Sequence, residues 1–182
     1  MNSFSDENLM VRVRTGEVNR LGLLFERHHV RLYNYFLRML QQPGTSEDLV
    51  QEVFFRILKY KHTYKEEVPF VRWMYRIAQN VGYDHFGKKK EEQAPQEEPM
   101  GATPDMVGKL SHQLDVGHLK KAFAQLSTEQ REVLVLSRYQ DMKYNDIAQL
   151  TGVSVSAVKV RVHRALKELR TRFFKVAREE AS

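Results

Sequence analysis

The stretch "GVSVSAVKVRVHRAL", residues 152–166, places its valines at two spacings at once. Val158, Val160 and Val162 alternate with charged or polar residues, which is a strand pattern, and valine favours strands. Apolar residues of this stretch and its continuation also repeat at helical spacing: Val155, Val158, Val162, Ala165, Leu166 and Leu169. The helical period explains six apolar positions against three for the strand, and only the helix continues through "RALKELR". We therefore predict a helix, with Val160 on its outer face.

The residues just before this helix predict a shorter helix and a tight turn. In "MKYNDIAQLTG" a short helix starts near Lys143 or Asn145 and ends at Thr151–Gly152, because glycine readily adopts the left-handed cap. Ser154 can then cap the next helix. A short helix, a glycine turn and a longer basic helix predict a helix-turn-helix, whose second helix enters the major groove of DNA.

The outer face of the second helix carries groups suited to DNA. Residues 154–178 contain eight Lys or Arg residues and a single acidic one, Glu168. Ser, Lys and Arg offer hydrogen bonds to base edges, and a small apolar side chain such as Val160 can meet a thymine methyl group. The alternative is an ordinary helical hairpin with a solvated basic face. We favour DNA binding, because the glycine turn, the cap and an exposed apolar residue among basic ones coincide.

Composition excludes several classes of function. The 182 residues carry a formal charge of +6 and no cysteine, so a disulfide, a thiolate metal site and a cysteine nucleophile are ruled out. No HExxH spacing, glycine-rich phosphate loop or nucleophile elbow occurs, so we expect no metal, no cofactor and no enzyme activity. No apolar run approaches the roughly 18 residues of a membrane span, and the polar N-terminus lacks a signal-peptide core. We therefore expect a cytoplasmic protein that is not itself a membrane protein.

The chain is expected to form two small all-α domains joined by a flexible acidic linker. The segment "EEQAPQEEPMGATPD", residues 91–105, holds three of the five prolines and five acidic residues without a single Lys or Arg. Such a segment favours a linker over a packed element. We expect a helical domain at 1–87, the linker at 88–113 and the helix-turn-helix domain at 114–182.

Three or four helices are expected in the first domain. A long amphipathic pattern covers residues 18–40, and a second helix starts near Thr45–Ser46, which can cap it. A third helix runs from Pro69, a suitable first residue, to about Phe86. In the second domain, Ser127 and Gln130 have the spacing of a capping box.

The helix "TSEDLVQEVFFRILKYK" leaves one aromatic residue outside its apolar stripe. That stripe is formed by Leu49, Val50, Val53, Phe54, Ile57 and Leu58. Phe55 lies opposite, among Asp48, Gln51, Glu52 and Lys59. An aromatic ringed by polar residues is a candidate protein contact, but single exposed aromatics are also common. The pattern alone leaves both open.

The helix "PFVRWMYRIAQNVGYDHF" combines a core stripe with a basic, aromatic outer side. The stripe holds Phe70, Trp73, Met74, Ile77, Ala78 and Val81, and the other side holds Arg72, Tyr75, Arg76, Gln79, Tyr83 and Phe86. Cations that follow phosphates and rings that stack on bases suit single-stranded nucleic acid. Asn80, at the edge of the stripe, could read a base. In the alternative, some of these rings pack on the first helix and leave a solvated basic tail.

Three segments together resemble the extracytoplasmic-function (ECF) sigma factors, the small two-domain group of bacterial RNA polymerase initiation factors. They are "SEDLVQEVFFRI", "PFVRWMYRIAQNVGYDHF" and "LSTEQREVLVLSRYQDMKYNDIAQLTGVSVSAVKVRVHRALKEL", and the resemblance covers roughly residues 15–172. Each segment is moderately specific, and their order and spacing make the set highly specific.

The resemblance implies a role for each surface. Asp48, Gln51, Glu52 and Phe55 would dock on the clamp coiled coil of core RNA polymerase. The loop "HTYKEEV" (62–68) and the following helix would capture the non-template strand of the −10 element, through Arg72, Tyr75, Arg76, Asn80 and Tyr83. Duplex contacts to the −35 element would come from Ser154, Ser156, Ala157, Lys159, Val160, Arg161, His163 and Arg164. The linker would thread toward the polymerase active site and RNA exit path.

The implied partners are core RNA polymerase, promoter DNA and an anti-sigma factor. Family members often have Pro, Gly and Thr where this chain has Ser154, Ser156 and Ala157, and often Ser at Val160, so promoter preference does not carry over. Two other interpretations are a stand-alone helix-turn-helix regulator, which would bind duplex DNA without polymerase, and an adaptor that is indifferent to DNA.

Overall fold

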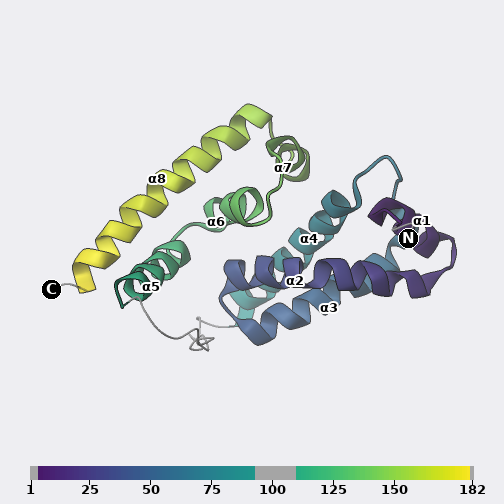
Figure 1. The fold of residues 1–182 in the computed structure, drawn as a ribbon, viewed down its shortest axis with the longest axis horizontal. Coiled ribbons are helices and arrows are strands. Elements are labelled where there is room, and N and C mark those ends of the chain that lie inside the picture. The colour runs from purple at the N-terminus through teal and green to yellow at the C-terminus, as the bar shows by residue number, and fades with distance from the viewer. Residues whose placement is uncertain (1–3, 93–109, 181–182) are drawn as a thin grey trace. The chain divides into compact units, whose positions relative to one another are not determined.

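The computed structural model describes residues 4–92 and 110–180, which belong to two compact units, Met1–Pro99 and Met100–Ser182. Every regular element within the described ranges is a helix, as Figure 1 shows. The predicted all-α fold is therefore confirmed. No described helix has the length and apolar character that crossing a membrane requires.

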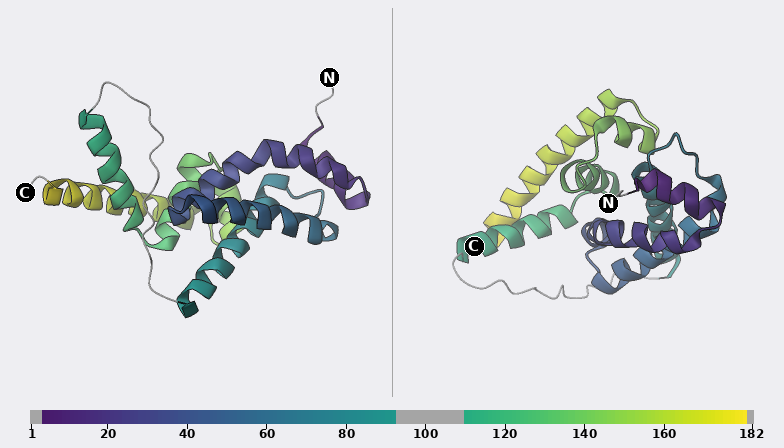
Figure 2. Two further views of the ribbon diagram at one scale, coloured as in Figure 1. Left: turned by 90° about the horizontal axis from the view of Figure 1, so that it is seen from below. Right: turned by 45° about the vertical axis from the view of Figure 1, so that its right-hand side comes forward.

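Residues 4–92 of the first unit form four α-helices and two short 3₁₀ turns. The helices are α1 (Asp6–Thr15), α2 (Leu21–Leu40), α3 (Pro43–Lys59) and α4 (Phe70–Glu92), and the turns are η1 (Val18–Arg20) and η2 (Lys61–Thr63). Helix α3 packs against both α2 and α4, and α1 contacts α2, α4 and η2. Figure 2 shows α2 and α3 running side by side. The core between them includes the fully buried Leu32, Phe36, Val53, Ile57, Met74 and Ala78.

In the second unit, three helices pack along one long helix. The elements are α5 (Leu110–Ala124), α6 (Thr128–Leu134), the π-helical turn η3 (Val135–Tyr139), α7 (Tyr144–Thr151) and α8 (Val155–Glu180). Helices α5, α6 and α7 each contact α8 and lie along it in Figure 1. The side of α8 facing them buries Val158, Val162, Ala165 and Val176. Near its end, Glu180 pairs with His118 and Lys121 of α5.

The predicted helix ends of the second unit are confirmed. Ser127 and Gln130 form both halves of a capping box at the start of α6. Gly152 ends α7 with φ of +71°, a left-handed conformation that glycine adopts without steric cost. The Ser154 hydroxyl then accepts the Ala157 amide at 3.1 Å and caps α8.

Two helix starts in the first unit differ from the prediction. Helix α3 begins at Pro43, because proline fits a first helical position, where no amide hydrogen bond is needed. Ser46 therefore lies inside the helix, buried, and its hydroxyl donates to the Gln42 carbonyl at 2.6 Å. Pro69 lies just before α4, where its carbonyl accepts the amides of Arg72 and Trp73.

Helices extend into both ends of the segment 88–113, where a linker was expected. Helix α4 continues past Phe86 to Glu92, and α5 begins at Leu110. The remaining residues of that range, 93–109, lie outside the described residues.

Helix α1 had no counterpart among the segments that the sequence pattern singled out. Most of its residues are polar, so its apolar face is narrow. Leu9, Met10 and Val13 are nevertheless fully buried against the rest of the first unit.

Candidate nucleic-acid and protein interfaces

Exposure along α8 shows which period the valines follow. Val158 and Val162 are 0% and 2% exposed, whereas Val160 between them is 47% exposed. The helical prediction is thus confirmed, with Val160 outward. Val155 and Leu166, predicted on the buried side, are instead 36% and 37% exposed. At about 100° per residue they lie at the margins of the side that Val158 and Val162 bury.

The first turns of α8 present hydrogen-bonding and cationic groups on the side that Val160 occupies. Their exposed members are Ser154, Ser156, Lys159, Arg161, His163 and Arg164, and Ala157 is half-buried among them. The Ser154 and Ser156 hydroxyl oxygens are 3.0 Å apart. These groups follow directly on the α7–Gly152 turn, which is the arrangement with which a helix-turn-helix enters the major groove.

On α3, the structure separates two adjacent phenylalanines. Phe54 is 6% exposed and Phe55 is 60% exposed. Asp48 and Gln51 are exposed on the same side, and Glu52 is half-buried. The surface formed by Asp48, Gln51, Glu52 and Phe55, called the α3 face below, is therefore an apolar ring in an acidic and polar surround.

Arg56 ties the α3 face to α4. Its Nε donates to Glu52 Oε1 at 2.6 Å and its Nη1 to Asp84 Oδ2 at 2.7 Å. Partial burial disfavours the charged guanidinium, but the hydrogen bonds to these two carboxylates outweigh it and raise the pKa of Arg56 above its ordinary value. The two helices are thus joined by charge-assisted contacts as well as by packing.

Helix α4 exposes three of its predicted nucleic-acid residues on one face. Arg76, Asn80 and Tyr83 follow each other at spacings of four and three, which places them on the same side of a helix, and all three are exposed. Arg72, one turn earlier, is half-buried. This set is called the α4 face below. It offers one aromatic ring, one amide and two cations.

The prediction that Tyr75 lies on the exposed side is wrong. Tyr75 is fully buried, and its ring packs edge-on against Tyr35 of α2 at a centroid distance of 5.4 Å. Burial raises the pKa of its phenol. Gln79 is also buried. The buried side of α4 is wider than the predicted apolar stripe, because α4 packs against α3 and also against aromatic side chains of α2.

Trp73 is more exposed than predicted. We predicted it in the core, but it is half-buried and packs against Tyr64 and Phe70 at centroid distances of 5.2 and 6.3 Å. Trp73 therefore packs against the segment that precedes α4.

This segment, residues 60–69, has a buried anchor and an exposed tip. Tyr64 is 1% exposed and its hydroxyl donates to the Val68 carbonyl at 2.8 Å, while Lys65, Glu66 and Glu67 are exposed. Burial raises the pKa of Tyr64 to about 12. Sequence reasoning singled out the segment but not Tyr64, whose polar and charged neighbours give no local sign of burial.

The sites are surfaces rather than pockets. Within 4–92 and 110–180, no three His, Asp or Glu side chains gather closely enough to hold a metal ion. The α3 face, the α4 face and the outer side of α8 around Val160 can bind partners through stacking, hydrogen bonds and charge.

Comparison with known proteins divides the chain into two parts that correspond to its two compact units. Residues 24–92 match the family model of sigma-70 region 2, and residues 118–169 match that of sigma-70 region 4. The ECF RNA polymerase sigma factor SigX of Bacillus subtilis is 31% identical over 87% of this chain and 85% of its own length. The RNA polymerase sigma factor CarQ of Myxococcus xanthus is 29% identical over 88% and 93%.

Solved structures share the fold. CnrH, solved in complex with the cytosolic domain of CnrY, superposes with a TM-score of 0.71 at 23% identity, over 91% of this chain and 95% of that one. The sigma factor RpoE of Bartonella quintana, solved with the anti-sigma factor NepR, gives 0.69 at 22% identity, over 83% and 94%.

The chain belongs to the ECF family of RNA polymerase sigma factors. As a sigma factor it binds core RNA polymerase, directs it to specific promoters and helps to melt the −10 region. The family match favours this function over that of a stand-alone helix-turn-helix regulator.

Proposed function

We propose that the two units divide the promoter between them, the first taking the polymerase and the −10 strand and the second the −35 duplex. The observation that supports this proposal is the presence in one chain of two exposed faces with different chemistry. The α4 face offers a ring and an amide, which suit unpaired bases. The outer side of α8 offers a helix-turn-helix surface, which suits a duplex.

On α8, binding to the −35 element would combine phosphate and base contacts. The lysine and arginine side chains neutralise phosphates, the hydroxyl groups reach base edges, and Val160 meets a thymine methyl group. The contact set is Ser154, Ser156, Ala157, Lys159, Val160, Arg161, His163 and Arg164. Because Ser154 already caps α8 through its oxygen, it has less hydrogen-bonding capacity left for DNA than Ser156 has.

On α4, the −10 strand would be held after its bases leave the duplex. Tyr83 stacks on a base, an interaction worth about 1–3 kcal/mol per base, and Asn80 hydrogen-bonds a base edge. Arg72 and Arg76 follow the phosphates. Tyr75 has no part in this contact, because it is buried. Melting is then driven by capture of extruded bases rather than by bond chemistry.

Docking on core RNA polymerase would use the α3 face. Phe55 supplies the apolar anchor, and Asp48, Gln51 and Glu52 supply a polar rim that suits a basic partner surface. Two modest DNA-binding units on one polymerase gain affinity through effective concentration. Free of polymerase, the protein should bind promoter DNA weakly.

An anti-sigma factor is the proposed regulatory partner. The Bartonella quintana sigma factor that shares this fold was solved in complex with one. A partner of this kind would cover exposed binding groups on each unit, Phe55 on α3 and Val160 on α8 among them. It would act in the cytoplasm, where we place the sigma factor and its polymerase.

The test is transcription of sheared genomic DNA by core RNA polymerase, with and without this protein. Added protein should produce discrete new start sites. Asn80→Ala should lower their use about tenfold while leaving co-elution with core polymerase intact, and Asn19→Ala, an exposed asparagine on η1, should change nothing. The absence of new start sites with a folded protein would refute the proposal.

A further inference from the structure

Segment 60–69 and the start of α4 are held by α1, a helix far away in sequence. Glu7 Oε1 accepts the backbone N–H of Phe70 at 3.0 Å. Arg14 Nη1 donates to the backbone carbonyl of Tyr64 at 2.8 Å. Both hydrogen bonds are partly buried, and they fix the two ends of the stretch from Tyr64 to Phe70.

Helix α1 is itself firmly anchored. Leu9, Met10 and Val13 are fully buried. At its first residue, Asp6 accepts Arg27 Nη1 at 2.7 Å and lies 2.6 Å from Nε2 of His28, both on α2. A helix tied to α2 in this way can serve as a fixed support for residues 64–69, which belong to no helix.

The Glu7 contact meets a specific need of α4. The first amides of a helix have no partner within the helix, and a carboxylate is favoured at this positive end. Phe70 is the first residue of α4, and the Glu7 carboxylate supplies the missing acceptor from a different helix. The ring of Phe70 also packs on His28 at 5.4 Å, so α1, α2 and the start of α4 meet at one point.

We propose that α1 is a brace for −10 recognition, in which Glu7 and Arg14 are positioning residues. They hold segment 60–69 and the first turn of α4 in the shape that receives the unpaired −10 strand. This inference rests on the proposed function of the α4 face. Neither residue needs to touch DNA, because each acts through backbone atoms of the segment.

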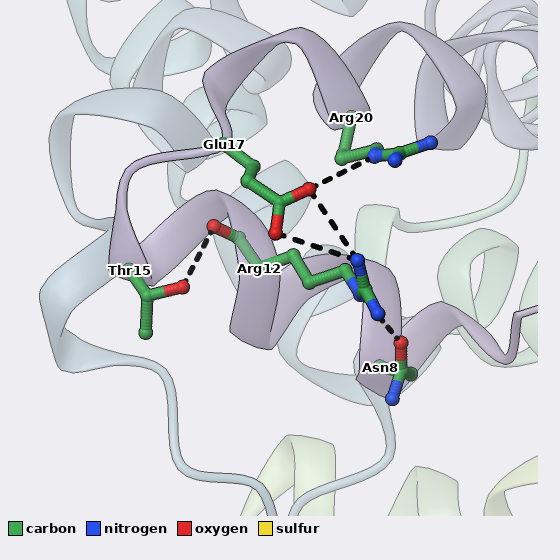
Figure 3. A network of polar contacts seen from close by, with 5 residues as sticks. All are labelled: Asn8, Arg12, Thr15, Glu17 and Arg20. Atoms are coloured by element: carbon green, nitrogen blue, oxygen red, sulfur yellow. Dashed lines mark hydrogen bonds and ion pairs between the residues drawn. The ribbon is translucent and has the colours of Figure 1, made fainter.

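The opposite side of α1 supplies matched controls. Arg12 lies on the same helix as Arg14, and its Nε donates to Asn8 Oδ1 at 3.1 Å. Its Nη1 donates to Glu17 Oε1 at 3.4 Å. Glu17 also accepts a hydrogen bond from Arg20 Nε at 3.1 Å, as Figure 3 shows. These hydrogen bonds are exposed, and each joins residues between Asn8 and Arg20. Arg12→Ala and Glu17→Ala thus remove an arginine and a glutamate from exposed contacts while leaving the Glu7 and Arg14 hydrogen bonds in place.

The experiment measures promoter opening by the full-length protein bound to core RNA polymerase. The probe is a promoter fragment obtained with the wild-type holoenzyme, carrying 2-aminopurine in the non-template strand of its −10 region. Glu7→Ala and Arg14→Ala should open it about tenfold more slowly, as expected for loss of one charge-assisted hydrogen bond. Arg12→Ala and Glu17→Ala should open it at the wild-type rate. Glu7→Gln, which keeps an acceptor oxygen, should retain most of the rate.

Amide hydrogen exchange separates positioning from general destabilisation. In Glu7→Ala the Phe70 amide and its neighbours in segment 60–69 should exchange about tenfold faster, while α2 and α3 exchange as in the wild type. Wild-type opening rates in Glu7→Ala and Arg14→Ala, or uniformly faster exchange across the unit, would overturn the brace. If these two variants open normally while Asn80→Ala is slow, only the brace is wrong. If the wild-type holoenzyme itself gives no opening signal, the proposed function fails and the brace with it.

Discussion

Replacing Phe55 with alanine tests the docking surface without disturbing the fold. The side chain is 60% exposed, so the free protein gains little stability from it. The free energy of unfolding should change by no more than about 0.5 kcal/mol, the range for surface substitutions. By contrast, Phe54→Ala at the buried neighbouring position should lower it by about 3–5 kcal/mol.

The expected loss of affinity follows from the exposed area. A phenylalanine side chain presents about 200 Å² of surface, so 60% exposure leaves about 120 Å² to be buried on docking. At about 25 cal/mol per Å² this amounts to about 3 kcal/mol. Since about 1.4 kcal/mol changes Kd tenfold, Phe55→Ala should weaken binding to core polymerase about a hundredfold.

The assay is fluorescence anisotropy of labelled protein titrated with core RNA polymerase. Val30→Ala is the matched control, because Val30 is 55% exposed on α2 of the same unit and outside the α3 face. It should bind like the wild type. A Phe55→Ala variant that binds within about threefold of the wild type, or a Val30→Ala variant that loses as much, would refute the assignment of the docking face.

Three further predictions concern α8 and segment 60–69. Arg164→Ala should reduce the slope of log affinity against log salt for holoenzyme binding to its promoter by about 1, and an unchanged slope would show that Arg164 meets no phosphate. Ser154→Ala should lower the unfolding free energy of the second unit by about 1 kcal/mol in a denaturant titration, because it removes the cap of α8. Ser154→Asp should keep the cap but weaken promoter binding. An alanine variant as stable as the wild type would contradict the cap. Burial raises the pKa of Tyr64 from 10.0 to about 12, so the unfolded chain loses this proton first and the free energy of unfolding should fall as pH rises from 10 to 12. In urea titrations over that pH range, the free energy of unfolding of the Tyr64→Phe variant should fall less than that of the wild type. An equal fall in both proteins would contradict the burial of Tyr64.

The parts of the fold that follow from local rules could be predicted from sequence. The outward Val160 between two buried valines, the Gly152 turn and the Ser127–Gln130 capping box each depend on neighbours within a few residues. Helical periodicity and capping chemistry act over that range, so the pattern determines them. The α8 surface could therefore be listed before the structure was known.

Features that depend on distant segments could not be predicted in this way. Tyr75 lies outside the apolar stripe of its own helix, and it is buried in contact with Tyr35 of α2. Helix α1 shows a narrow apolar face, and its role lies in contacts with Phe70 and Tyr64 at sequence separations of 63 and 50. No pattern within a single helix contains this information.

The roles of the candidate residues came from the family resemblance, and their exposure came from the structure. Phe55 illustrates the difference, because its pattern left open whether it was a contact or a lone exposed aromatic. The structure adds its 60% exposure and the link through Arg56 to α4. The prediction that it docks on polymerase remains to be tested.

The most direct test of the central claim is selection of genomic DNA fragments by this protein alone, by core RNA polymerase alone and by the two together. A sigma factor that divides its promoter between two units should enrich fragments with two spaced elements only when both components are present. Enrichment of the same fragments by the protein alone, with equal strength, would contradict the account and identify a stand-alone DNA-binding regulator.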